Sequence, residues 1–249
     1  MSSELAGNSA VITGSSSGLG KASAKALAEN GVNVLLNGRD GARLADAKAE
    51  VANVATGRVV TYQGDITDLD AIHGLISKAI DEFGCLDHLV TSAGGPPRLS
   101  FEDTTDEDWF EAFELLVMSV VRLIRESNEH LRADTGGTVV TITSMATKEP
   151  IPSNVLSGAV RATVVSLVKA LATDFAPNVR VNSVLPGLFQ TPRRADRGDP
   201  GIKTETDVPL REIGDPSKLG EVVAFLCSER SSYVTGSAIP VDGGALKSI

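Results

Sequence analysis

The chain has 249 residues, of which 42% are hydrophobic and 22% charged; this suits a globular protein with one large α/β domain or two small ones. Its formal net charge of -9 argues against nucleic acid or an anionic membrane as partner, because both are polyanions. The sequence shows no signal peptide, no apolar run approaching the ~20 residues of a membrane span and no metal-ligand pattern around Cys85 or Cys227, which predicts a cytoplasmic protein with two buried free thiols and no metal.

Short apolar segments alternate with amphipathic ones along the chain. Strands are expected at 9–14, 32–39, 59–67, 86–94, 137–144, 179–187 and 238–244. Helices are expected at 20–31, 42–53, a segment ending at 83, 106–131, 155–175 and 218–229. Such alternation, with strands rich in β-branched residues, predicts an α/β fold: a doubly wound parallel sheet of about seven strands with helices on both faces.

No linker, repeat or low-complexity segment divides the chain, which predicts one domain over residues 1–249. The only irregular stretch, 189–208, is about twenty residues long and rich in charges, and loops of that length act as lids or binding loops. Its arginines, Arg193, Arg194 and Arg197, could hold an anionic substrate group. Asp196 and Asp199 are interleaved with them, so a self-neutralised loop is the other interpretation.

The first expected strand ends in the glycine-rich turn TGSSSGLG, and a helix follows. Glycine permits a tight turn and lets a pyrophosphate approach the backbone, while the helix start supplies unpaired N–H groups. This strand-turn-helix context indicates dinucleotide binding, against the alternative of a purely structural turn. The residues expected to bind the phosphates are Gly14, Ser16, Ser17, Gly18, Leu19 and Gly20.

The second expected strand ends with Arg39. At this position, proteins that bind NAD have an acidic residue that contacts the ribose 2′-hydroxyl. A guanidinium suits a 2′-phosphate, so NADP(H) is preferred, with NAD(H) possible because Asp40 could still face the ribose. Asp65 and Ile66 follow the third strand. Asp65 could accept a hydrogen bond from the adenine amino group, or cap the next helix, or both.

With these motifs the chain resembles the short-chain dehydrogenase/reductase superfamily over nearly its whole length, and in particular 3-oxoacyl-[acyl-carrier-protein] reductases and related sugar and alcohol dehydrogenases. Further matches are TSAG, ITS ending at Ser144, NSVLPG and the C-terminal YVTGSAIPVDGG. The resemblance implies a Rossmann fold, interconversion of a small-molecule carbonyl and alcohol, and a homo-oligomer, either a tetramer or a dimer. It adds Ser92, Ala93, Gly94, Arg161, Pro186, Gly187 and Thr191 to the expected cofactor-binding residues.

The resemblance fails at the chemistry. The family places a catalytic Tyr about 13 residues after the serine and a Lys four residues later; counting from Ser144 gives Ser157 and Arg161. Leu116 stands where the family has a catalytic Asn. Arg161 cannot act as an ordinary acid or base, but it can place positive charge under the nicotinamide ribose. Ser144 and Ser157 can donate hydrogen bonds to an oxyanion.

Another proton donor is Lys148, in the loop after Ser144, if burial lowers its pKa; a solvated loop lysine is the alternative. The sequence therefore predicts an NADP(H)-dependent oxidoreductase of a carbonyl/alcohol pair, on a small or acyl-type substrate, with a non-standard proton donor. A second hypothesis is a catalytically impaired NADP(H)-binding sensor or structural subunit. A lyase or isomerase is a third.

Overall fold

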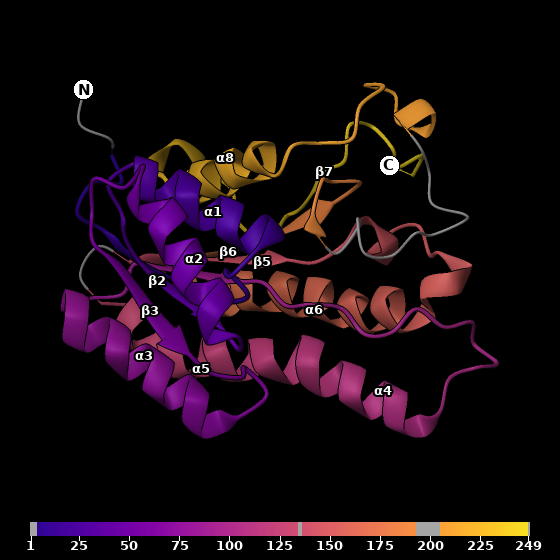
Figure 1. Ribbon diagram of the computed structural model, residues 1–249, viewed down its shortest axis with the longest axis horizontal. Coiled ribbons are helices and arrows are strands. Elements are labelled where there is room, and N and C mark those ends of the chain that lie inside the picture. The colour runs from indigo at the N-terminus through magenta and orange to yellow at the C-terminus, as the bar shows by residue number, and fades with distance from the viewer. Residues whose placement is uncertain (1–3, 134–135, 193–204, 249) are drawn as a thin grey trace.

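The computed structural model describes residues 4–133, 136–192 and 205–248. Its centre is a seven-stranded sheet in the order β3-β2-β1-β4-β5-β6-β7 (Figure 1). The strands are β1 (Ser9–Ile12), β2 (Asn33–Gly38), β3 (Val59–Gln63), β4 (His88–Thr91), β5 (Gly137–Ile142), β6 (Val179–Pro186) and β7 (Ala238–Val241). All six strand pairs are parallel. The expected doubly wound α/β fold is confirmed.

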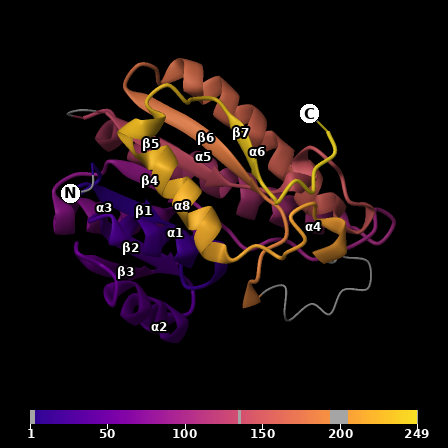
Figure 2. The ribbon, with the colours of Figure 1, turned by 90° about the horizontal axis from the view of Figure 1, so that it is seen from above.

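Helices cover both faces of this sheet. They are α1 (Gly18–Glu29), α2 (Gly41–Ala52), α3 (Leu69–Phe83), α4 (Asp106–Phe113), α5 (Ser119–Leu131), α6 (Val155–Asp174) and α8 (Pro216–Cys227). Side chains of α1, α2 and α8 form one hydrophobic core with the sheet, and those of α3, α5 and α6 form another. Figure 2 looks onto α1 and α8, which lie across one face. They pack closely, because a Cβ added to Gly220 of α8 would lie 2.5 Å from the Ala22 carbonyl oxygen.

The strand order reverses between β1 and β4, and this reversal matters for ligand binding. From β1 the chain winds outward through β2 and β3, then returns to β4 on the other side of β1 and winds the opposite way. At this reversal the loops leaving the carboxyl ends of β1 and β4 diverge, and in open parallel sheets that crevice is where ligands bind.

The expected single helix over 106–131 is interrupted. α4 and α5 are separated by a π-helical turn, Glu114–Met118. Such turns add a residue to a helix and are frequent at functional sites. The sequence-based prediction was wrong here because the apolar spacing of a helix does not register one inserted residue. Leu116, at the position of the missing Asn, lies in this turn and is 2% exposed.

One helix of the described residues, α6, is long and apolar enough to span a membrane by length and composition, with a mean hydropathy of 1.6. Arg161 and Lys169 lie within this helix, so it is not an uninterrupted apolar run of the kind that the sequence analysis considered. α6 packs against β6 and contributes Leu156, Val160, Val164 and Val168 to a core cluster. A core helix passes the same test, so this observation carries no further conclusion.

The cysteines are both free, but only Cys227 is buried; Cys85 is half-buried, which corrects the expectation for it. Cys85 lies between α3 and β4, with Sγ 3.5 Å from Asp87 Oδ2. Nearby, His88 is buried at the start of β4, with Nδ1 2.9 Å from Thr138 Oγ1 and Nε2 3.0 Å from Asn8 Nδ2. Burial lowers the pKa of His88 to about 4, against the opposing charge of Asp87.

We expect the free energy of unfolding to fall by about 2 kcal/mol between pH 7 and pH 5 through His88 alone. Its pKa is depressed in the folded state from 6.5 to about 4, so the unfolded chain binds the proton more readily. The stabilisation is present above the unfolded pKa and is lost as pH falls towards the folded one. Urea unfolding at both pH values measures this change. His88→Gln should reduce the difference, whereas the exposed His73→Gln should retain it; equal differences in both variants would contradict the assignment.

Candidate functional site

Two adjoining hollows open at the strand reversal. The first, the central cleft, has a volume of about 300 Å³. It is lined by Gly14, Ser17, Gly18, Leu19, Gly20, Ser92, Ala93, Gly94, Gly95, Arg98, Ile142, Thr143, Ser144, Asn154, Ser157, Arg161, Pro186, Gly187 and Thr191. The second, the edge pocket, has a volume of about 340 Å³. It is lined by Gly14, Ser16, Ser17, Asn37, Gly38, Arg39, Asp40, Arg43, Gly64, Asp65, Ile66, Ser92, Ala93, Gly94, Gly95 and Leu115.

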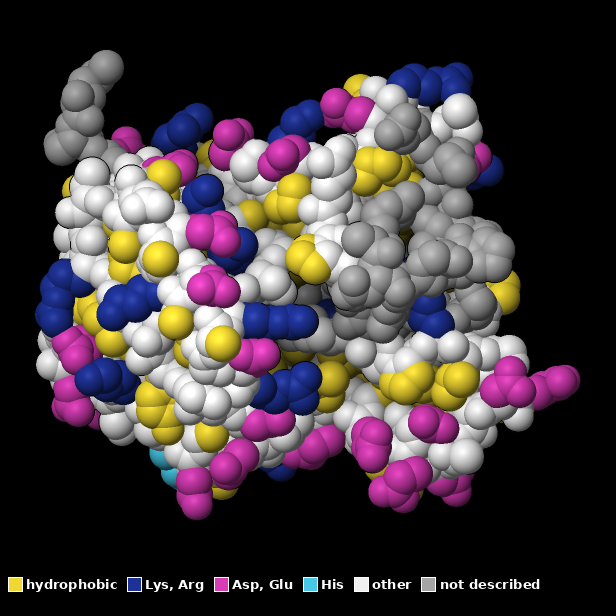
Figure 3. All heavy atoms as spheres, in the orientation of Figure 1, with side chains coloured by type: hydrophobic (Ala, Val, Ile, Leu, Met, Phe, Trp, Pro, Cys, Tyr) yellow, Lys and Arg dark blue, Asp and Glu magenta, His cyan; other side chains and the backbone are white. Residues whose placement is uncertain are grey.

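These linings bring together every residue expected to bind a cofactor, from the carboxyl ends of five strands, β1, β2, β3, β4 and β6, and from α6. The two hollows share residues of the glycine-rich turn and the segment after β4, so they form a crevice across the reversal. Figure 3 shows Lys and Arg side chains beside the hollow in the middle of this face, with acidic side chains between them. The structure thus provides an elongated crevice, while the role of each lining residue stays a prediction.

The glycine-rich turn leaves the start of α1 open. Gly14 and Gly18 both have φ of +56°, which favours glycine, and a Cβ on Gly14 would lie 2.6 Å from the Ser92 carbonyl oxygen. Thr13 Oγ1 ties the turn to β4 by donating to that oxygen at 2.8 Å. The side chain of Ser17 makes no capping hydrogen bond to α1. The first N–H groups of the helix therefore remain available to an anion, and the backbone cradle fits a pyrophosphate.

The edge pocket carries two arginines. Arg39 is exposed, and its Nη1 lies 3.5 Å from Asp65 Oδ2. Asp40 is the N-cap of α2 and accepts from the N–H groups of Ala42 and Arg43, so the structure uses this carboxylate to start a helix. Arg43, in the first turn of α2, lines the same pocket and was not predicted. Its position could have been predicted from the sequence, because the first turn of the helix that follows Asp40 lies next to the strand end that carries Arg39.

Asp65 lines the edge pocket as expected, but it also holds its own loop. Oδ1 accepts from the Thr67 N–H at 3.0 Å and from the Thr67 hydroxyl at 2.9 Å. Burial opposes ionisation of Asp65, yet the bonds from Thr67 and the charge of Arg39 outweigh it and hold the pKa of the carboxyl below its ordinary value. The alternative that Asp65 caps the next helix is wrong, because the N-cap of α3 is Asp68. Asp65 instead holds the loop before that helix, and it remains charged beside any bound ribose or base.

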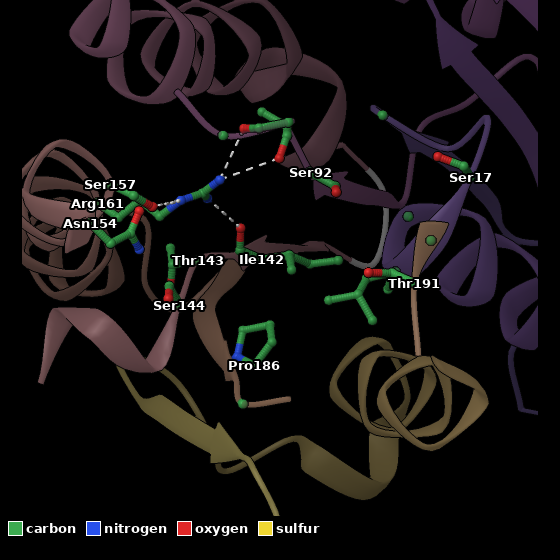
Figure 4. Close-up of a pocket in the computed structure, with 18 of the residues that line it drawn as sticks. Ser17, Ser92, Ile142, Thr143, Ser144, Asn154, Ser157, Arg161, Pro186 and Thr191 are labelled. Atoms are coloured by element: carbon green, nitrogen blue, oxygen red, sulfur yellow. Dashed lines mark hydrogen bonds between the residues drawn. The ribbon is translucent and has the colours of Figure 1, made fainter. Parts of the chain in front are cut away.

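The hydroxyls of the central cleft come from β5 and α6. Ser144 follows β5, is half-buried, and accepts from the Ala146 N–H at 3.1 Å. Ser157 lies in the first turn of α6 and is 7% exposed. Figure 4 shows both residues on the side of the cleft where α6 passes. Since each oxygen accepts a bond from the protein, each hydroxyl hydrogen can point into the cleft.

Arg161 is buried one turn after Ser157, at 8% exposure. Its Nε donates to Ser157 Oγ at 3.3 Å. Its Nη1 donates to the Ile142 carbonyl at 3.1 Å, and its Nη2 to the carbonyls of Ala93 at 3.3 Å and Gly94 at 3.1 Å (Figure 4). Arg161 therefore joins α6 to the carboxyl ends of β4 and β5. Leu116 and Arg161 line the same small cavity of about 10 Å³ behind this junction.

The expectation that Lys148 donates a proton requires correction. Lys148 is exposed at the end of a short 3-10 turn, Met145–Thr147, and is not one of the residues lining the cleft. Two polar side chains that the sequence did not predict, Arg98 after β4 and Asn154 before α6, do line it. Sequence reasoning missed both because loop side chains follow no period.

The expected lid, 189–208, is described only at its ends. Phe189 is buried and pairs with Gly214, and Val208 packs against Met145 and Ala245. Arg193, Arg194, Asp196, Arg197 and Asp199 lie outside the described residues.

Comparison with known proteins gives matches along the chain. A family model described as enoyl-(acyl carrier protein) reductase matches residues 14–245. An uncharacterized oxidoreductase of Methylorubrum extorquens is 33% identical over 97% of this chain and 99% of its own. The 3-oxoacyl-[acyl-carrier-protein] reductase of Thermotoga maritima is 30% identical over 96% and 98%. L-sorbose reductase from Gluconobacter frateurii, solved with NADPH and L-sorbose, is 32% identical, covers 100% of both chains and has a TM-score of 0.92.

Proposed function

Because the chain belongs to the short-chain dehydrogenase/reductase superfamily and is thus an oxidoreductase, we propose that it interconverts a carbonyl and an alcohol with NADP(H), using hydroxyls in place of a tyrosine acid. The observation that carries this proposal is the crevice itself. The phosphate-binding turn lies along it, two arginines lie at one end, and Ser144 and Ser157 line the other part.

The crevice fits a dinucleotide by the chemistry of its donors. The start of α1 and the backbone at Gly14 and Gly18 would hold the pyrophosphate. Arg39 and Arg43 would bind a ribose 2′-phosphate, which favours NADP(H) over NAD(H). When bound, NADPH supplies the hydride, a hydrogen with two electrons, that reduces a carbonyl carbon.

The chain's own groups would act on the carbonyl oxygen. A carbonyl oxygen would gain negative charge as its carbon is reduced, and that charge would have to be stabilised and then neutralised by a proton. Ser144 and Ser157 can both donate hydrogen bonds to that oxygen. The hydrogen bond from Arg161 polarises the Ser157 hydroxyl. Arg161 neither gives up nor takes a proton in doing so, because a guanidinium stays protonated. The proton itself then comes from water through the hydroxyls, and the reaction lacks a tuned acid.

Arg39→Ala combined with Arg43→Ala should lower the NADPH/NADH affinity ratio about 10- to 100-fold, since a charged hydrogen bond contributes roughly 1.5–3 kcal/mol. NADPH affinity should fall while NADH affinity stays nearly constant. Fluorescence titration of both cofactors measures the ratio. The matched control is Arg58→Ala, an exposed arginine paired with Glu82 away from the crevice, which should leave the ratio unchanged. An unaltered ratio in the double variant would remove the basis for the NADP preference.

The test of the function is titration of the purified protein with NADPH and NADH, followed by a carbonyl panel monitored through cofactor absorbance. Tight NADPH binding with turnover supports the proposal. Tight binding without any turnover would instead establish the second candidate, a cofactor-binding sensor or structural subunit. One observation favours that candidate. Arg161, at the position of the family's catalytic Lys, donates its hydrogen bonds to the carbonyls of Ala93, Gly94 and Ile142, which is a structural use of the side chain.

We also propose a homo-oligomer. α4 leaves Phe110 71% and Phe113 42% exposed, and the neighbouring α6 has a mean hydropathy of 1.6 over a window of which only 44% is buried. A second copy of the chain would cover this face, because large aromatic side chains exposed beside an apolar helix favour association. Light scattering coupled to size-exclusion chromatography measures the mass. A cytoplasmic location stays a prediction.

A further inference from the structure

Asn154 presents an amide to the central cleft. It precedes the first residue of α6 and lines the cleft together with Ser144 and Ser157, and Figure 4 shows all three on the side where α6 passes. The Asn154 side chain makes no capping hydrogen bond to α6, and no other residue of the described chain hydrogen-bonds to it. Since partly buried polar groups are rarely left without a partner, this half-buried amide is suited to bind a ligand in the cleft.

The backbone holds this amide in place. Asn154 ends a 3-10 turn that begins with Pro152, whose ring fixes one backbone dihedral. α6 then packs closely on the turn that follows Ser144, because a Cβ added to Gly158 would lie 3.2 Å from the Ala146 carbonyl oxygen. The segments that carry the amide and the hydroxyls are therefore fixed relative to one another, as preorganised hydrogen-bond donors require.

We propose that Asn154 is a third hydrogen-bond donor to the reacting oxygen, beside Ser144 and Ser157. The proposal rests on the proposed function, because it names a further group that acts on the carbonyl of that same site. An oxygen that gains negative charge offers three lone pairs, which match one amide N–H and two hydroxyls. Amide side chains act in this way in oxyanion sites. Asn154 would stabilise the charge but would not supply the proton, because an amide does not ionise.

Asn154→Ala should lower kcat for cyclohexanone about 10²-fold in the NADPH-loaded protein and change KM little, since the lost bond is made to charge that develops during the reaction. Cyclohexanone is the probe because the carbonyl oxygen is its only polar atom. Asn178→Ala, which removes an exposed amide before β6 at the opposite end of the sheet, is the matched control and should leave both values unchanged. A rise in KM with an unchanged kcat would overturn the proposal.

Asn154→Asp gives a second readout, one that a purely structural role would not move. A carboxylate at this position repels the charge that develops on the oxygen, whereas a protonated carboxyl donates a hydrogen bond to it. Because the pKa of an aspartate is ordinarily about 3.9, its protonated fraction rises about 100-fold between pH 8 and pH 6. We expect kcat to rise relative to that of Asn154→Ala as pH falls. A ratio of the two kcat values that does not change with pH would overturn the proposal.

A binding measurement covers the case of very slow turnover. In nuclear magnetic resonance spectra of the NADP-loaded protein, the side-chain amide resonances of Asn154 are identified by their loss in Asn154→Ala. Cyclohexanone should move one of the two amide proton resonances downfield, and methylenecyclohexane, which has the same shape without the oxygen, should not. No shift, or equal shifts with both compounds, would overturn the role of Asn154 and leave the oxidoreductase proposal intact. Failure to bind NADPH at all would instead overturn the proposed function.

Discussion

Replacing Ser157 with Tyr and Arg161 with Lys in one variant should raise kcat for carbonyl reduction about 10²- to 10⁴-fold, which is the usual contribution of a positioned general acid. Ser157 lines the central cleft at the start of α6, so a phenol at this position would extend into the space where the carbonyl must lie. A phenol has a pKa near 10, and an adjacent ammonium lowers it towards neutrality. A serine hydroxyl is a far weaker acid than either.

The matched control is Ser157→Phe with Arg161→Lys, which has the same ring and the same lysine but no hydroxyl. The difference in kcat between the two variants therefore isolates the proton donor from the effect of filling the cleft. Saturating NADPH and single-turnover measurements keep binding and release out of the comparison. If both variants have the same kcat, the missing acid is not what limits this protein, and the cleft has diverged in its substrate as well.

Adding Leu116→Asn to the Tyr/Lys variant tests whether the third departure belongs with the other two. Leu116 lies in the π-helical turn and lines the cavity behind Arg161, so its side chain contributes an apolar surface there. An amide in its place could hydrogen-bond to water beside the new lysine. We expect a further, smaller gain in kcat in the triple variant.

Much of the fold and of the crevice could be predicted because local patterns determine them. The glycine-rich turn between a buried strand and a helix predicts where Gly14 and Gly18 lie. Both have positive φ angles, which the tight turn requires and which glycine adopts most readily. Arg161 was harder. Its spacing from Ser157 predicts that both face the cleft, but its carbonyl partners are 19, 67 and 68 residues away. Contacts of that separation depend on how the strands align, which no local pattern encodes.

The three carbonyls bound by Arg161 lead to a stability prediction. Arg161→Met should lower the free energy of unfolding by about 3–5 kcal/mol, because each carbonyl left without its donor contributes a penalty of roughly 1–3 kcal/mol. A shift of about 10 °C in Tm corresponds to this in a domain of this size. The Tm of Arg161→Lys should lie between those of the parent protein and Arg161→Met. One ammonium cannot reach the carbonyls on β5 and on the segment after β4 at once.

The control for this loss is Lys169→Met, which removes a positive charge from an exposed position of the same helix. Its Tm should stay close to that of the parent protein, so a comparable decrease there would attribute the effect to helix charge and not to the carbonyls. The comparison also separates two roles of Arg161. If Arg161→Met loses stability but keeps residual reductase activity, Arg161 positions the strand ends and Ser157, and the hydroxyls carry the chemistry. If activity disappears while Tm is unchanged, the guanidinium acts on the oxyanion directly.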